Sequence, residues 1–243
     1  MPLEFALGIP PERVRAAVLE TGRAMEEVVG QDGVRCRVSG YSTDSIRYNV
    51  ALRVANPSIL SGPRDEFLSR FWYVAQRHGI CLGVPDDASA QALPTMDEAA
   101  RREALAGARL FGKEPELIAT LARDAAYQCY RAGEILLQPN EPADQAFLVV
   151  SGVLRAAVPG TGDQFWMERL DAGQMFVVQE MLQAAPSPVR LVAESDAGVL
   201  AIPAARLASL LDTHRPAARD LAAVIEARRR SVAALARGIR VAA

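Results

Sequence analysis

The clearest pattern in the chain is a strict alternation of apolar and polar residues at positions 45–54. In SIRYNVALRV every second side chain is apolar, so the apolar side chains share one face of an extended segment. The preceding stretch VRCRVSGY, residues 34–41, alternates in the same way and is followed by Ser-Thr-Asp, which suits a turn. The two segments predict an antiparallel pair of half-buried strands.

Segments with helical spacing flank this pair. Residues 10–29, PPERVRAAVLETGRAMEEVV, place apolar side chains on one helical stripe after two prolines. Residues 61–80, SGPRDEFLSRFWYVAQRHGI, predict a second helix that ends at Gly79. Short apolar runs at residues 2–9 and 80–84 predict the remaining strands. The expected order is β-α-β-β-α-β, the ferredoxin-like split βαβ module.

The periodic pattern of apolar residues ends after residue 84, where Pro, Asp, Ser and Ala occur without a period, which is typical of a linker. Residues 96–111, 114–130 and 203–236 then predict helices with apolar faces. Between them lie short β segments separated by glycines and turn-forming pairs, a pattern typical of a β-roll or barrel. The chain is therefore expected to be α+β. The expected domains are residues 1–86 and 98–243, joined by a linker at 87–97.

Two stretches of the first domain carry a more specific signal. SIRYNVALRVAN and FLSRFWYVAQRHGICLGVPDD combine a strand, a helix ending in aromatic residues, and a His-Gly-Ile turn that leads to a proline. They resemble the carboxy-terminal cytoplasmic domain of small-conductance mechanosensitive (MscS-family) channels. The alternative is a ferredoxin-like domain of no particular function, in which Phe71, Trp72 and Tyr73 are core and interface aromatics. His78 is interpreted as a helix-end residue, which the helix dipole favours.

The second domain has a stronger signature. RAGEILLQPNEPADQAFLVVSGVLR lies at the centre of a helix, β-roll, two-helix order. With Gly133, Gly152 and Gly173 at the positions of structural glycines, residues 97–236 resemble a cyclic-nucleotide-binding domain. Leu110 and Phe111 stand at the usual entry to the domain. Asn140 stands where the family has glycine, a tolerable exchange because asparagine also enters the left-handed region.

The phosphate-binding cassette of this family departs from its pattern here. Such pockets hold a cyclic phosphate with backbone N–H groups and an arginine, and a glutamate binds the ribose hydroxyl. Counted without gaps between Gly173 and Ala193, the Phe-Gly-Glu of the family falls on Phe176, Val177 and Val178, and its Pro-Arg falls on Pro186 and Ser187. The glycine, the glutamate and the arginine are therefore all absent.

These replacements predict weak or absent binding of cAMP or cGMP. Val177 places a β-branched side chain where the backbone should approach phosphate, Val178 accepts no hydrogen bond, and Ser187 carries no charge. Glu180 and Arg190 are a possible substitute pair, but both are out of register, and Arg190 would point to the strand face opposite to Ser187. The cavity is expected to be empty, packed by apolar side chains, or adapted to another ligand, such as another nucleotide or an acidic metabolite held by Arg190.

Composition limits the remaining possibilities. Twenty-seven basic and 29 acidic residues give a formal charge of −2, so any contact with nucleic acid or an anionic membrane must be local. Three cysteines, Cys36, Cys81 and Cys129, suit a reducing compartment and form neither a disulfide framework nor a metal site. With two histidines and no nucleophile motif, no catalytic residue is predicted, and the protein is expected not to be an enzyme.

The basic residues near the carboxyl end have two interpretations. Arg228, Arg229, Arg230, Arg237 and Arg240 are interpreted as a solvated helix end that complements the dipole, with an anionic or acidic partner as the alternative. No helix-turn-helix follows before Ala243, which argues against sequence-specific DNA recognition. PGTGD, residues 159–163, is interpreted as a hairpin turn because no phosphate-loop lysine follows it.

The two resemblances together imply a function. They indicate the cytoplasmic regulatory part of an MscS-type ion channel, with a preceding membrane domain, a homo-oligomeric ring, a possible small nucleotide ligand, and a place on the cytoplasmic side of the inner membrane. The chain itself shows neither a membrane-spanning run nor a signal peptide and is expected to be soluble. The alternative is a free soluble sensor or adaptor that oligomerises through its α/β module.

Overall fold

The computed structural model describes the chain in two compact units, Met1–Thr95 and Met96–Ala243. The described residues are 1–25, 27–30, 33–55, 61–82, 96–108, 110–111, 114–159, 164–183 and 185–241.

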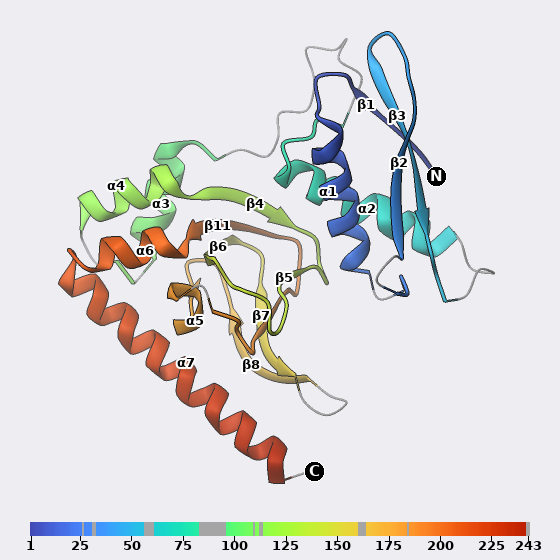
Figure 1. The fold of residues 1–243 in the computed structure, drawn as a ribbon. Coiled ribbons are helices and arrows are strands. Elements are labelled where there is room, and N and C mark those ends of the chain that lie inside the picture. Colours follow the sequence, from blue (N-terminus) through green and yellow to red (C-terminus); the bar gives the residue numbers. More distant parts are fainter. Residues whose placement is uncertain are drawn as a thin grey trace. The chain divides into compact units, whose positions relative to one another are not determined.

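The first unit is a three-stranded antiparallel sheet with two helices (Figure 1). The strand order is β1-β3-β2, so β3 is central. The two strands predicted from alternation, β2 and β3, pair antiparallel as expected. The elements are β1 (Pro2–Ala6), α1 (Pro11–Arg23), β2 (Val34–Tyr41), β3 (Ser45–Leu52) and α2 (Ser61–Arg77).

Helices α1 and α2 cover one face of this sheet. The alternate residues Ile46, Tyr48 and Val50 of β3 are at most 3% exposed and belong to one core with residues of both helices. Phe67 and Phe71 of α2 stack in this core, with ring centroids 5.8 Å apart. Among the described residues of this unit no helix lies on the other sheet face, which explains why β2 and β3 alternate between apolar and polar residues.

The predicted sixth element, a strand at residues 80–84, is wrong in its described part. Ile80, Cys81 and Leu82 form no strand, and residues 83–84 lie outside the described residues. The amide of Gly79 (φ +63°) donates to Gln76 O and the amide of Ile80 donates to Ala75 O, which is the Schellman end of a helix. The fully buried Ile80 is therefore used to end α2, and the unit has the order β-α-β-β-α.

Two side chains at this helix end, His78 and Arg77, contact one glutamate of α1. His78 follows the last residue of α2, and its Nε2 lies 2.7 Å from Oε2 of Glu20 on α1. Arg77 Nη2 lies 2.9 Å from the other oxygen of the same carboxylate. Burial raises the pKa of Glu20, but the bonds from His78 and Arg77 outweigh it and leave this pKa below its usual value.

The second unit begins with helices α3 (Glu98–Gly107) and α4 (Pro115–Asp124) and continues as a β-roll of two antiparallel sheets. The strand orders are β5-β10-β7-β8 and β4-β11-β6-β9. The strands are β4 (Ala126–Tyr130), β5 (Ile135–Leu137), β6 (Gln145–Ser151), β7 (Leu154–Pro159), β8 (Gln164–Leu170), β9 (Met175–Phe176), β10 (Arg190–Ala193) and β11 (Ala197–Pro203).

Three further helices complete this unit: α5 (Gln179–Leu182), α6 (Ala204–Leu211) and α7 (Arg215–Val241) (Figure 1). The helix predicted over residues 114–130 is wrong beyond Asp124, because residues 126–130 form β4 and pair with β11. Asn140 has φ 64°, so the predicted left-handed conformation is confirmed. Within the described residues no helix is both long and apolar enough to cross a bilayer.

Candidate cyclic-nucleotide site

The cassette, residues 176–190, keeps the expected frame but is closed by apolar side chains. Strand β9 pairs with β6 through Phe176 and Phe147, and the short helix α5 follows two residues later. Phe176 and Val177 are fully buried and Val178 is 4% exposed. Met181 of α5 is 1% exposed and packs into the same core. Apolar side chains therefore fill the place where a phosphate cradle would need open backbone.

Ser187, which stands in place of the family arginine, is fully buried and used within its own loop. Its Oγ accepts a hydrogen bond from the amide of Val189 at 3.2 Å. Its backbone carbonyl accepts from the amide of Asn140 at 2.7 Å, and its amide donates to Glu141 O at 3.3 Å. Ser187 thus ties the cassette to the turn before β6 and presents no charge to a ligand.

The structure does not bring the substitute pair into this place. Arg190 is the cross-strand partner of Ala157, and Ala157 is the partner of Trp166. Partners in a sheet share a face, so Arg190 lies on the face of the 45% exposed Trp166. Leu191, which has the opposite orientation, is fully buried in the core. Glu180 instead lies beside α7, in the lining of a small cavity.

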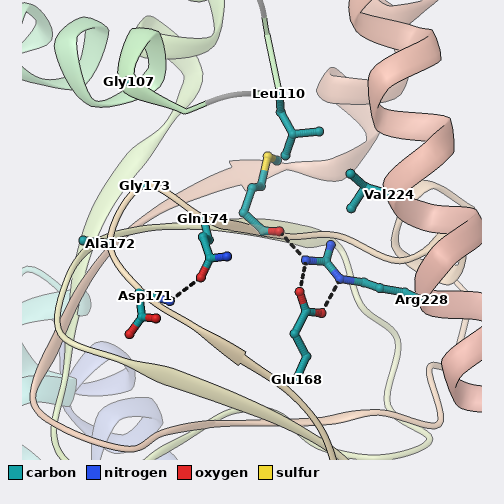
Figure 2. Close-up of a pocket in the computed structure, with 10 residues that line it drawn as sticks. Gly107, Leu110, Glu168, Asp171, Ala172, Gly173, Gln174, Val224 and Arg228 are labelled. Carbon is teal, nitrogen blue, oxygen red and sulfur yellow. Dashed lines mark hydrogen bonds and ion pairs between the residues drawn. The ribbon is translucent and has the colours of Figure 1, made fainter.

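Arg228 of α7 is the charged group that reaches the cassette. Its side chain is 8% exposed and forms a bidentate ion pair with Glu168 of β8, with Nε–Oε2 and Nη2–Oε1 distances of 2.7 and 3.0 Å. Nη2 also donates to Met175 O at 2.7 Å, and Nη1 donates to Val177 O at 3.0 Å. Figure 2 shows the guanidinium of Arg228 next to the carboxylate of Glu168.

These contacts, named here the α7 anchor, consist of Arg228, Glu168 and the carbonyls of Met175 and Val177. The guanidinium also lies 5.1 Å from the centroid of the Phe176 ring, within the range of a cation–π contact. Both carbonyls flank the first residue of the cassette, so a change in the cassette backbone directly alters the acceptors of Arg228. The anchor therefore links the position of α7 to the conformation of the cassette.

The interpretation as a solvated basic helix end is wrong for Arg228, which is buried, and also for Arg229 and Arg230, which are exposed but lie in the middle of α7. Arg229 and Arg230 are exposed, and both pair with Glu226 of the same helix. Hydrogen bonds from Arg229 lower the pKa of Glu226, and the same bonds raise the pKa of Arg229. The side chains of Arg237 and Arg240 lie outside what the structure describes.

Two cavities flank the anchor. One, of about 40 Å³, lies between the cassette and α7 and is lined by Val178, Glu180 and Ile225 among others. The other, of about 580 Å³, is lined by Leu110, Asp171–Met175, Val224 and the anchor pair (Figure 2). Small-ligand pockets typically enclose about 300 Å³ or more, and a single water needs about 15 Å³. The cavity at the cassette therefore has room for a few waters at most and is too small for a cyclic nucleotide.

Comparison with known families identifies this unit. Residues 127–214 match the family model of the cyclic nucleotide-binding domain. The chain thus carries a cyclic nucleotide-binding domain, preceded by an α/β unit. Nothing in the fold or the comparisons shows an MscS channel domain. No curated protein matches the chain.

Several solved structures are similar to the chain. The catabolite activator protein of Thermus thermophilus is 23% identical, over 51% of this chain and 59% of its own, with a TM-score of 0.45. The sensor domain of the transcriptional regulator DNR from Pseudomonas aeruginosa is 16% identical, over 54% of this chain and 89% of its own, with a TM-score of 0.48. The regulatory domain of Toxoplasma gondii PKA, crystallised with cAMP, is 13% identical, over 76% and 59%, with a TM-score of 0.46. The chain thus spans about three fifths of the first and third of these proteins.

Other chemistry has little support in the described part of the chain. No group of three or more His, Cys, Asp or Glu side chains there could hold a metal ion. Cys36 and Cys129 are half-buried and Cys81 is exposed, and these three cysteines form no disulfide with one another. Each of the two histidines pairs with one glutamate. His78 pairs with Glu20, and His214 pairs with Glu114.

Proposed function

We propose that the protein is a non-catalytic regulator whose cyclic nucleotide-binding domain acts through the docking of α7. One observation carries this proposal: Arg228 of α7 binds the carbonyls of Met175 and Val177, on both sides of Phe176. Any event that shifts these carbonyls weakens the anchor. Any event that holds α7 elsewhere frees the cassette backbone.

The apolar side chains that fill the cassette limit which ligands can act on the domain. A ligand changes a two-state equilibrium only if it binds the docked and undocked states with different affinity. Val177, Val178 and Ser187 leave no cradle for a cyclic phosphate in the docked state. The proposed input is therefore a partner or a ligand other than cAMP or cGMP, and the proposed output is the position of α7.

Calorimetric titration of the intact chain with cAMP and with cGMP tests the proposal. We expect no saturable heat up to millimolar nucleotide, because a buried anion without a charge-assisted donor loses several kcal/mol of binding free energy. A thermal unfolding curve of the same sample shows whether it is folded. Saturable binding in the micromolar range would contradict the proposal and would require the cassette to open around the nucleotide.

A second proposal keeps the channel function for the first unit. It is supported by the resemblance of SIRYNVALRVAN and FLSRFWYVAQRHGI to the MscS cytoplasmic domain and by the β-α-β-β-α order. In this proposal the chain is the regulatory end of a channel subunit that assembles as a ring. Light scattering on the product of the complete gene, purified in detergent, distinguishes the two functions. A ring with membrane segments favours the channel, and a small soluble oligomer favours the free regulator.

A further inference from the structure

The face of the first sheet that carries no helix is strongly basic. Residues that alternate with the core positions of β2 and β3 point to this face, and four of them are exposed arginines. We name this surface the basic face; its arginines are Arg35, Arg37, Arg47 and Arg53.

Strand register places these arginines next to one another. Arg37 is opposite Asn49, the residue two positions along β3 from Arg47, and Arg35 is opposite Ala51, two positions from Arg53. Directly opposite residues on neighbouring strands share a face. The six residue-to-residue steps from Arg47 to Arg53 span about 20 Å of extended chain. The four guanidinium groups therefore form one continuous patch across two strands.

The basic face lacks internal neutralisation. Among the described residues, none of the four arginines forms an ion pair, whereas Arg70 and Arg77 of the same unit pair with Glu66 and Glu20. The acidic residue nearest in register is Glu4, opposite Arg47, and its carboxylate accepts a hydrogen bond from Ser45. An array of exposed, unpaired guanidinium groups attracts a polyanion.

The other residues of the face decide which polyanion fits. Asn49, Ala51 and Ser39 stand between the arginines, and no large apolar side chain lies there. Protein partners usually require an apolar interface centre, whereas nucleic-acid interfaces are more polar and much more positive. Guanidinium groups bind phosphate oxygens in bidentate geometry. Among the described residues no aromatic ring lies on this face for base stacking, so contact is made with phosphates and does not depend on base sequence.

We propose that the basic face binds the phosphate backbone of a nucleic acid without sequence preference. The formal charge of −2 on the whole chain does not oppose this contact, because the positive charge is concentrated on one face. The proposal is independent of the α7 anchor, because all four arginines belong to the first unit.

Fluorescence anisotropy with labelled 20-nucleotide poly(dT) and poly(U) tests this site in the intact chain. At 50 mM salt we expect a dissociation constant of about 100 μM or lower for both oligonucleotides. Four phosphate contacts predict that the logarithm of the association constant falls with the logarithm of the salt concentration with a slope of about −3. In the double variant Arg35→Ser, Arg37→Ser this slope should be about −1.5, because two contacts remain. These serines lie on exposed strand positions, so thermal unfolding should stay unchanged.

The matched control is the double variant Arg13→Ser, Arg23→Ser on α1, which removes the same two charges from exposed helix positions of the same unit. It should leave affinity and slope unchanged. Equal loss in both double variants would overturn the site, since the effect would then be one of net charge. Absence of binding at 50 mM salt would also overturn it. So would binding of a labelled polyglutamate peptide without binding of either oligonucleotide, because the partner would then be an acidic protein.

Discussion

The substitution Arg228→Ala should lower the free energy of unfolding of the second unit by about 3 kcal/mol. It removes both bonds to Glu168 and leaves the carbonyls of Met175 and Val177 without these donors. Breaking a buried ion pair from one side costs about 3–5 kcal/mol. The lower figure is expected because the side chain of Glu168 is 31% exposed and can turn toward water. In a unit of this size the midpoint of thermal unfolding should fall by about 6–12 °C.

Arg229→Ala is the matched control for this prediction. Its side chain is 62% exposed, next to Arg228 on the same helix, so its loss should change stability by less than about 0.5 kcal/mol. The pair Arg228→Met with Glu168→Leu should recover most of the lost stability, because no buried charge remains unpaired. Hydrogen exchange should show faster exchange in α7 for the alanine variant. If Arg228→Ala and Arg229→Ala were equally stable, the α7 anchor would contribute nothing to the free energy of unfolding, and the prediction would be wrong.

Local rules predicted the parts of the fold that depend on neighbours in sequence. The alternation in residues 45–52 reflects a strand with a core on one side and water on the other, and the structure confirms it. The left-handed position of Asn140 follows from the steric preference of one residue. The turn-rich order of short β segments identified the β-roll for the same reason.

The errors arose where a tertiary contact decided between local alternatives. The run at Ile80 is apolar enough for a strand, yet its amide and side chain end α2. The stretch AAYQCY continues a helical pattern, but its residues Ala126–Tyr130 instead pair with five residues of β11. Periodicity alone cannot separate a short buried strand from the end of a helix.

Arg228 is the residue of the candidate site that sequence reasoning misassigned, although a signal for it exists. Leu221, Ile225 and Val232 form the buried or half-buried stripe of α7, and Arg228 falls on that stripe at helical spacing. Arg229 and Arg230 fall outside it. An arginine on an apolar stripe needs an acid and further acceptors. Its partner Glu168 is 60 residues away in sequence, so the fold was needed to find it.

The frame around the cassette depends on Gly152, and Gly152→Ala should lower the free energy of unfolding by about 3 kcal/mol or more. Gly152 lies between β6 and β7 with φ +76°, and a Cβ there would lie 2.2 Å from Asp196 O and 2.8 Å from the Cα of Ala197. Both are backbone atoms, so relief requires the turn before β11 to move. Gly173→Ala is the control: it has φ +83° but no atom within 4 Å, so only the conformational cost of about 1 kcal/mol applies. Thermal unfolding of the two variants separates the contributions. If both variants lost the same free energy of unfolding, the positive φ alone, and not the close approach to Asp196, would explain why residue 152 is glycine.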